Sequence, residues 1–188
     1  MKKILILGAA LLGTVSLNAQ TYKLDPAHSS LGFVITHLSI AEMQGAFTKF
    51  DGKMTSSKDD FSDAVVELTA ETNSVFTGSD GRDKHLASAD FFDAEKYPTM
   101  TFKSTSFKKD KGNTYKVTGD FTFHGVTKSI TLDADYKGKT KGHGGDVYVW
   151  KVKGSIKRTD FGIAPNMDDS SVGNVVNLNA DLEFAKEK

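Results

Sequence analysis

The chain has 188 residues, with 24 Lys and Arg against 24 Asp and Glu, and no cysteine. Such an even balance provides no basic surface for nucleic acid, so we expect no nucleic-acid partner. Without cysteine there are neither disulfides nor an N-terminal thiol for a lipid anchor. The fold must therefore rest on an apolar core, to which the 13 Phe contribute much of the volume.

The first residues are typical of a secretory signal peptide. Lys2 and Lys3 precede an apolar run over residues 4–17, and the small Ala19 offers a cleavage site before Gln20. We expect residues 1–19 to be removed and residues 20–188 to form one domain in the periplasm or outside the cell. A retained membrane anchor is the alternative, although the run is short for a membrane span.

The first half of the remaining chain predicts three strands and one helix. Strands are expected over residues 31–37, 43–54 and 65–70, the second with a twist or bulge between its two Phe residues. A short helix is expected near residues 80–89, with Asp80 as its N-cap and Asp83 favouring the positive end of the helix dipole.

The second half alternates apolar and polar residues with a period of two. After a strand over residues 99–107, four clean runs follow at residues 115–123, 130–136, 148–156 and 176–184. His124-Gly125 separates two of these runs by two residues, which predicts a tight hairpin. The polar, glycine-rich residues 138–146 predict a surface loop.

About eight antiparallel strands predict a closed barrel whose interior is either filled or wide enough for one ligand. The polar rows carry dense charge of both signs, which is costly inside a narrow barrel, so the apolar face is expected to point inward. Gly119, Ala134, Gly154 and Ala180 lie in the apolar rows. They indicate either a cavity or room for neighbouring aromatic rings.

Several motifs, in this order and spacing, resemble the YceI-like family of bacterial polyisoprenoid-binding proteins over the whole mature chain. The most specific is Arg-Asp-Lys-His-Leu at residues 82–86, running into residues 90–93 and 97–98. The others lie at residues 25–39, 45–52, 119–128, 158–162 and 172–174. One small departure is Asn174, where an acidic residue is more usual.

The resemblance implies an all-β, extended, eight-stranded antiparallel, lipocalin-like barrel that holds a long isoprenoid lipid, such as a polyprenyl phosphate or a quinone. It also implies export and often a homodimer, with no cofactor other than the bound lipid. A carrier between envelope membranes would also make transient contact with a membrane. It favours a cavity wall made by Phe33, Ile35, Phe121, Phe123, Leu132, Tyr136, Trp150, Val152, Leu178 and Leu182.

A lipid head group needs polar contacts at the mouth of such a barrel. Arginine binds phosphate in a bidentate manner, and a helix N-terminus offers amide donors. The predicted head-group residues are His28, His37, Arg82, His85 and Arg158. The alternative is structural, with Arg82 paired to Asp83 and Arg158 to Asp160.

The sequence favours binding over catalysis. His28 and Ser29 are adjacent and point apart on an extended strand, so they do not form a nucleophile and its base. The five His show no metal-binding spacing, and we expect no metal.

The leading hypothesis is a carrier or store of isoprenoid lipid in the cell envelope. The alternatives are a filled barrel acting as a stress-related interaction module, and an enzyme acting on the bound lipid.

Overall fold

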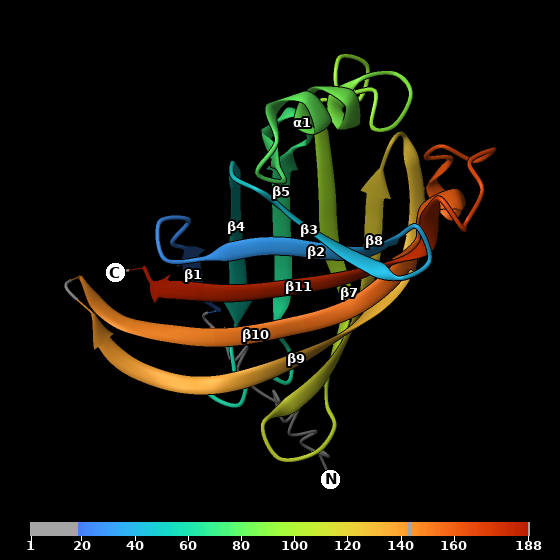
Figure 1. Cartoon of the computed structure of the whole chain (residues 1–188). Coiled ribbons are helices and arrows are strands. Elements are labelled where there is room, and N and C mark those ends of the chain that lie inside the picture. Colours follow the sequence, from blue (N-terminus) through green and yellow to red (C-terminus); the bar gives the residue numbers. More distant parts are fainter. Residues whose placement is uncertain (1–18, 143, 188) are drawn as a thin grey trace, which may run out of the picture.

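The computed structural model describes residues 19–142 and 144–187, and its strands form one antiparallel sheet that closes into a barrel. Eight strands make the ring in the order β1-β4-β5-β7-β8-β9-β10-β11, and the end of β11 pairs back onto β1. In Figure 1, β9, β10 and β11 curve across the front of β4 and β5. The expected eight-stranded barrel with one short α-helix is confirmed for this part of the chain. The predicted signal segment lies outside it, except for Ala19.

Short strands occupy the N-terminal part of the chain, and long strands of 10 to 17 residues occupy the rest. The elements are β1 (Gln20–Leu24), β2 (Ser30–His37), β3 (Ala41–Phe47), β4 (Phe50–Ser56), β5 (Val65–Glu71), η1 (Thr72–Ser74), β6 (Val75–Phe76), α1 (Asp80–Ala87), β7 (Thr99–Lys109), β8 (Thr114–Phe123), β9 (Val126–Gly142), β10 (Gly145–Lys157), η2 (Arg158–Phe161) and β11 (Val172–Lys186). The long strands make the barrel deep.

Strand β11 has two partners along one edge. Its C-terminal end, near Phe184, pairs with β1, whereas residues 176–181 pair with β2. Strand β2 then pairs with β3, so this hairpin continues the barrel wall where β1 ends. On its other edge β3 pairs only through Ala46 and Phe47, with the short β6. Among the described strands, residues 41–45 of β3 therefore have a partner on one side only.

The inner face of the barrel is apolar because side chains alternate along every strand. In β8 the residues Tyr115, Val117, Phe121 and Phe123 are buried, while their neighbours are exposed or half-buried. The outer face carries ion pairs such as Lys151 with Asp181. The charged rows are therefore outside, as the sequence predicts.

A loop closes one end of the barrel. Residues 57–64, between β4 and β5, fold Phe61 into the barrel with only 2% of its surface exposed. Its ring packs edge-on against Tyr22, Tyr148 and Trp150, with centroids 5.4 to 5.8 Å apart. The hydroxyl of Tyr115 donates to the carbonyl oxygen of Asp60 at 2.6 Å and so ties this loop to β8. We call this closed end the floor.

The Asp63 carboxylate holds the same loop in shape. It accepts hydrogen bonds from the hydroxyls of Ser56 and Ser57 and from the Ser57 amide. Desolvation by burial acts to raise the pKa of Asp63, but these hydrogen bonds outweigh it and hold the pKa well below its usual range. The carboxylate therefore stays ionised and keeps the floor loop in place at neutral pH.

Two predicted strand boundaries are wrong. The single strand expected over residues 43–54 is two strands, β3 and β4, separated at Thr48 and Lys49, whose backbones bond to Ser74 and Glu71 across the η1 turn. The surface loop expected over residues 138–146 is mostly strand, because β9 runs to Gly142 and β10 begins at Gly145. The glycine and charged residues indicate a loop, but they lie on strands that extend beyond the core. A strand there needs no apolar side chains.

The helix is correctly predicted but its cap is not. α1 covers Asp80–Ala87, and Ser79 occupies the N-cap position without a side-chain hydrogen bond. Asp80 therefore lies inside the first turn. Asp83 accepts hydrogen bonds from the backbone and hydroxyl of Thr77 instead. With two carboxylates in its first turn, this end of α1 does not suit the anion-binding role that the sequence suggested.

The predicted hairpin at His124-Gly125 is confirmed, since Phe123 pairs with Val126 and both turn residues have positive φ, at 50° and 73°. A type I′ turn requires positive φ at both central residues and favours glycine at the second position. A Cβ on Gly125 would lie 2.5 Å from the Tyr97 ring. We expect Gly125→Ala to lower the free energy of unfolding by about 2 kcal/mol, through the left-handed backbone and the clash together.

Chemical denaturation measures this loss. Gly112→Ala is the matched control, because Gly112 also has a positive φ, of 60°, but nothing lies within 4 Å of its Cβ position. It should lose about 1 kcal/mol, the backbone cost alone. Equal losses for the two variants would contradict a role for the Tyr97 contact.

Candidate functional site

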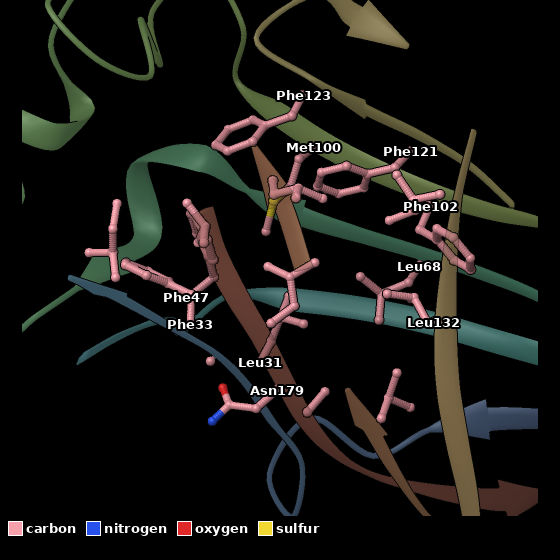
Figure 2. Close-up of a pocket in the computed structure, with 18 of the residues that line it drawn as sticks. Leu31, Phe33, Phe47, Leu68, Met100, Phe102, Phe121, Phe123, Leu132 and Asn179 are labelled. Atoms are coloured by element: carbon pink, nitrogen blue, oxygen red, sulfur yellow. The ribbon is translucent and has the colours of Figure 1, made fainter. Parts of the chain in front are cut away.

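A cavity of about 420 Å³ lies inside the barrel. Its lining runs along β11 from Val172 to Phe184, so the cavity extends over most of the length of this strand. Figure 2 shows aromatic and aliphatic side chains from several strands directed toward one another, while the Asn179 amide points away from them. None of the described residues that line the cavity is an Asp or Glu. The interior is therefore suited to an apolar ligand.

The structure places nine of the ten predicted wall residues on the cavity: Phe33, Ile35, Phe121, Phe123, Leu132, Trp150, Val152, Leu178 and Leu182. Tyr136 is the exception, and its prediction is corrected. The centroid of its ring lies 4.8 Å from that of Trp150 and 5.4 Å from that of Phe61, so Tyr136 belongs to the floor beneath the cavity. The period of two gives the face of a strand correctly but does not give depth along the barrel.

Other lining residues were missed. Leu68 and Phe102 lie on strands with the same alternation, which could have identified them. Phe92 and Met167 come from irregular segments near α1 and β11, where no periodic signal exists. These two close the cavity from outside the ring of strands.

Three inward-facing glycines let large side chains lie against the wall. A Cβ on Gly45 would be 2.3 Å from the Phe33 ring, one on Gly154 would be 2.4 Å from Leu132, and one on Gly119 would be 2.6 Å from Phe102. Each neighbour therefore occupies the space that the missing side chain leaves. Gly119 thus makes room for an aromatic ring, as one interpretation of the sequence holds, whereas Gly154 makes room for an aliphatic side chain. Ala134 and Ala180 line the cavity directly.

One end of the cavity has polar side chains. His37, Thr77, Arg82 and His85 line it together with Met167. The His85 side chain is 57% exposed, so the cavity reaches solvent here. In Figure 1 this end lies between α1, the β2–β3 hairpin and the loop that follows η2. We call it the mouth.

Arg82 lines the mouth, with part of its guanidinium unpaired among the described residues. Its Nε donates to the Thr77 hydroxyl at 2.7 Å and one Nη2 hydrogen to the Thr77 carbonyl oxygen at 2.8 Å. Three of its five N–H groups have no partner in the described part of the chain. No Arg82–Asp83 ion pair forms within hydrogen-bonding distance there, because Asp83 faces Thr77 instead. Arg82 thus combines a fixed position with open donors.

Arg158 has a different role from the one predicted. It is only 2% exposed, and its guanidinium donates to the carbonyl oxygens of five residues: Ile163, Ala164, Met167, Val172 and Gly173. It also bonds to Asp169 at 3.1 Å, not to the predicted Asp160. All five N–H groups are engaged, so none remains for a head group. Arg158 instead holds residues 162–173 against the mouth.

His28 does not lie at the mouth, and its predicted head-group role is wrong on position. It lies in the β1–β2 turn, at the opposite end of β2 from His37. Its ring pairs with the Asp25 carboxylate at 2.8 Å, and this hydrogen bond raises the pKa of His28 and lowers that of Asp25. His28 and Asp25 therefore shape a turn.

Neither a metal site nor a membrane-spanning helix occurs in the described residues. No group of three or more His, Asp or Glu could hold a metal ion there. His143 lies outside them. No helix in residues 19–142 and 144–187 is long and apolar enough to cross a bilayer.

Comparison with known proteins identifies the family. The YceI-like domain profile matches residues 22–184. The chain belongs to the YceI-like family. It is 40% identical to Protein YceI of Salmonella newport over 177 residues, which is 91% of this chain and 92% of that protein.

Solved structures agree with this YceI-like assignment. A Campylobacter jejuni YceI protein is 37% identical, with a TM-score of 0.72 over 89% of this chain and 98% of that one. A polyisoprenoid binding domain from Saccharophagus degradans has the same fold, with a TM-score of 0.67 and 16% identity over 88% and 98% of the two chains.

Asn174, the small departure from the family pattern, has a structural partner. Its side-chain oxygen accepts from the Thr159 amide at 3.3 Å and from the Thr159 hydroxyl at 2.9 Å. An acidic residue would accept the same bonds. The departure therefore leaves this corner of the YceI-like barrel intact.

The glycine positions generate a test of cavity width. In Gly45→Ala and Gly154→Ala, we expect Phe33 and Leu132 to be pushed into the lumen, where they take space from an apolar fluorescent probe. Affinity for the probe should fall roughly tenfold, or about 1.4 kcal/mol, which lies within the about 1–3 kcal/mol that overpacking costs. Probe titration measures this. Gly81→Ala, on exposed α1 with nothing within 4 Å, is the control and should bind like wild type. Wild-type binding in both wall variants would contradict the role of the glycines.

The engaged guanidinium of Arg158 generates a test of its structural role. We expect Arg158→Lys to lower the free energy of unfolding by about 3 kcal/mol, because lysine cannot satisfy several buried carbonyl oxygens at once. Arg82→Lys should lose about 1 kcal/mol or less, since only two bonds to Thr77 are affected. Urea denaturation compares the two. A smaller loss for Arg158→Lys than for Arg82→Lys would show that the buried network is unimportant.

Proposed function

We propose that this protein binds a single isoprenoid-type lipid, with the tail in the barrel and the head group at the mouth, for transport or storage in the cell envelope. The observation that carries the proposal is a cavity without carboxylates that ends at His37, Arg82 and His85. The fold shared with a domain named for polyisoprenoid binding, and the matching family profile, support the choice of an isoprenoid.

The cavity volume limits the tail. A methylene group is about as large as a water molecule, which takes about 30 Å³ of liquid, so 420 Å³ holds at least on the order of 15 carbon atoms. At least roughly three isoprene units would be enclosed on this basis. A longer tail would extend through the mouth or require the lumen to widen.

Energetics favour a reversible carrier. Each buried CH₂ gains about 0.8 kcal/mol relative to water, but a bilayer offers the tail nearly the same gain. Net exchange between protein and membrane is therefore close to neutral for the tail. Selectivity must come from the width of the lumen and from contacts with the head group.

The mouth favours an anionic or carbonyl-bearing head group. Arg82 supplies open N–H donors, and the imidazoles of His37 and His85 line the same end of the cavity. Arginine forms bidentate bonds with phosphate, which suits a polyprenyl phosphate, while a quinone carbonyl needs only one donor. The site residues proposed for the head group are therefore His37, Arg82 and His85.

The two other hypotheses are less well supported. A filled interaction module requires a packed interior, which the cavity argues against. An enzyme acting on the lipid requires a nucleophile or base near the mouth with an orienting partner. Of the polar side chains at the mouth, His85 has its Nε2 atom 3.3 Å from Oδ2 of the exposed Asp90, and loss of any turnover in His85→Ala would favour this third hypothesis.

Mass spectrometry of organic extracts from the purified mature protein tests the proposal, and we expect one lipid per chain. Trp150 is the only tryptophan and lines the cavity above the floor, so its emission should change when polyprenyl phosphate or a quinone is added. Arg82→Gln should weaken binding of the phosphate about tenfold and leave the quinone nearly unchanged, because a charged hydrogen bond is lost only with the anion. Absence of extracted lipid together with unchanged emission would refute the proposal.

Export to the periplasm, as the N-terminal segment predicts, is part of this proposal. The homodimer implied by the family resemblance also stays a prediction. Native mass spectrometry of the secreted form measures subunit number and ligand mass together, and N-terminal sequencing shows whether residues 1–19 are removed.

A further inference from the structure

We propose that the tip of the β2–β3 hairpin, Leu38-Ser39-Ile40, inserts into the surface of a zwitterionic lipid bilayer and holds the mouth of the cavity against it. This inference rests on the proposed lipid cavity and names the surface from which the cargo enters. Leu38 is 60% exposed and Ile40 is 91% exposed, the two largest values among the exposed large apolar residues of the described chain.

The tip is held in a fixed shape. Leu38 and Ser39 both have positive φ, at 50° and 63°, which is uncommon for residues other than glycine. The Leu38 amide donates to the Ser171 carbonyl oxygen at 3.0 Å, and the Ser39 hydroxyl to that of Ser170 at 3.3 Å. The turn is strained and is held by hydrogen bonds to residues 170–171. It keeps the Leu38 and Ile40 side chains in water, where they do not add to the stability of the fold.

The tip and the mouth are continuous. His37 precedes the tip and Met43 follows it, and both line the cavity. Val172, which pairs with His37, lines it too, as does Met167 in the loop that anchors the tip. In Figure 1 the hairpin turn lies beside this loop. An object bound by Leu38 and Ile40 therefore lies next to the route into the barrel.

The size and chemistry of the tip select a bilayer over a protein. Two side chains are far from the roughly 800 Å² per partner that a stable protein interface needs. Two aliphatic residues entering the acyl boundary are enough for weak, reversible membrane contact. A cavity that encloses about 15 carbons also gains from such contact, because the rest of a longer tail stays in lipid during transfer.

Charge decides which bilayer fits. Residues 30–47 contain one carboxylate, Glu42, and no Lys or Arg, and the anchoring loop over residues 162–171 contains only Asp168 and Asp169 as charged residues. All three are exposed, and Asp169 is paired with Arg158. α1, which also borders the mouth, adds no net charge, because Asp80 and Asp83 balance Arg82 and Lys84. The two remaining carboxylates near the tip therefore disfavour anionic lipid at low salt. A zwitterionic surface, such as phosphatidylcholine, avoids this repulsion.

Flotation with phosphatidylcholine vesicles tests the proposal, using the full mature chain. We expect Leu38→Ser with Ile40→Ser to reduce vesicle binding at least about tenfold, because two aliphatic side chains lose their transfer into the apolar phase. Val65→Ser is the control: Val65 is 40% exposed but begins β5 beside the floor loop, at the other end of the barrel, and should bind like wild type. Adding phosphatidylglycerol at low salt should weaken wild-type binding.

Each outcome separates this inference from the proposed function. Titration of Trp150 emission with a short-chain quinone in detergent-free buffer should be unchanged in the double variant. Loss of vesicle binding with retained quinone binding supports insertion of the tip into the bilayer. Equal vesicle binding by wild type and double variant contradicts insertion of the tip but does not affect the proposed lipid binding. A dimer that becomes monomeric in the double variant, without a change in vesicle binding, assigns the tip to contact between copies instead. Absence of quinone binding in wild type refutes the proposed function itself.

Discussion

The closed floor is the constraint on which the rest of the structure depends. Phe61 enters the barrel from a loop and packs against Trp150. The ring of strands is thereby closed at this end and open only at the mouth. The proposed lipid would then enter tail first and leave its head group at the mouth. Both the depth available to the tail and the polarity of the other end follow from this closure.

The mouth is built around a buried charge. Arg158 is the central donor for the carbonyl oxygens of residues 163–173, a segment too short and polar to form its own core. That segment in turn anchors the β2–β3 tip through Ser170 and Ser171. One guanidinium thus fixes both a wall of the opening and, indirectly, the most exposed apolar side chains near it. A buried arginine is tolerated here because every one of its N–H groups has an acceptor.

Much of the fold could be predicted from sequence because alternation reports directly on which face of a strand is buried. Residues 115–123 illustrate this, and so does the turn at His124-Gly125, where local chemistry alone sets the backbone. Strand ends were less predictable. Residues 138–142 read as loop, since a strand beyond the core carries no apolar row, and β1 is too short to show one.

The site was harder to predict than the fold, for a physical reason. The alternation of apolar and polar residues predicts which face of a strand is buried but not the position of a residue along the barrel axis. Tyr136 in the floor and Val152 in the cavity wall therefore cannot be distinguished by it. Arginine is equally ambiguous. Arg82 and Arg158 both lie in motifs of the family, yet only the count of carbonyl oxygens around each guanidinium shows that Arg158 is saturated and Arg82 is not.

The cavity itself argues that the barrel is made to be occupied. Without a ligand, the apolar lining of this cavity would face water that enters through the mouth, and the lining would lose the free energy gained by burying apolar surface. Gly45, Gly119 and Gly154 each leave the space of a side chain to a neighbour, so a larger residue at any of them would push that neighbour toward the lumen. A chain that keeps such an unfavourable space, and opens it beside polar donors, is best explained by a ligand whose apolar tail replaces the missing side chains.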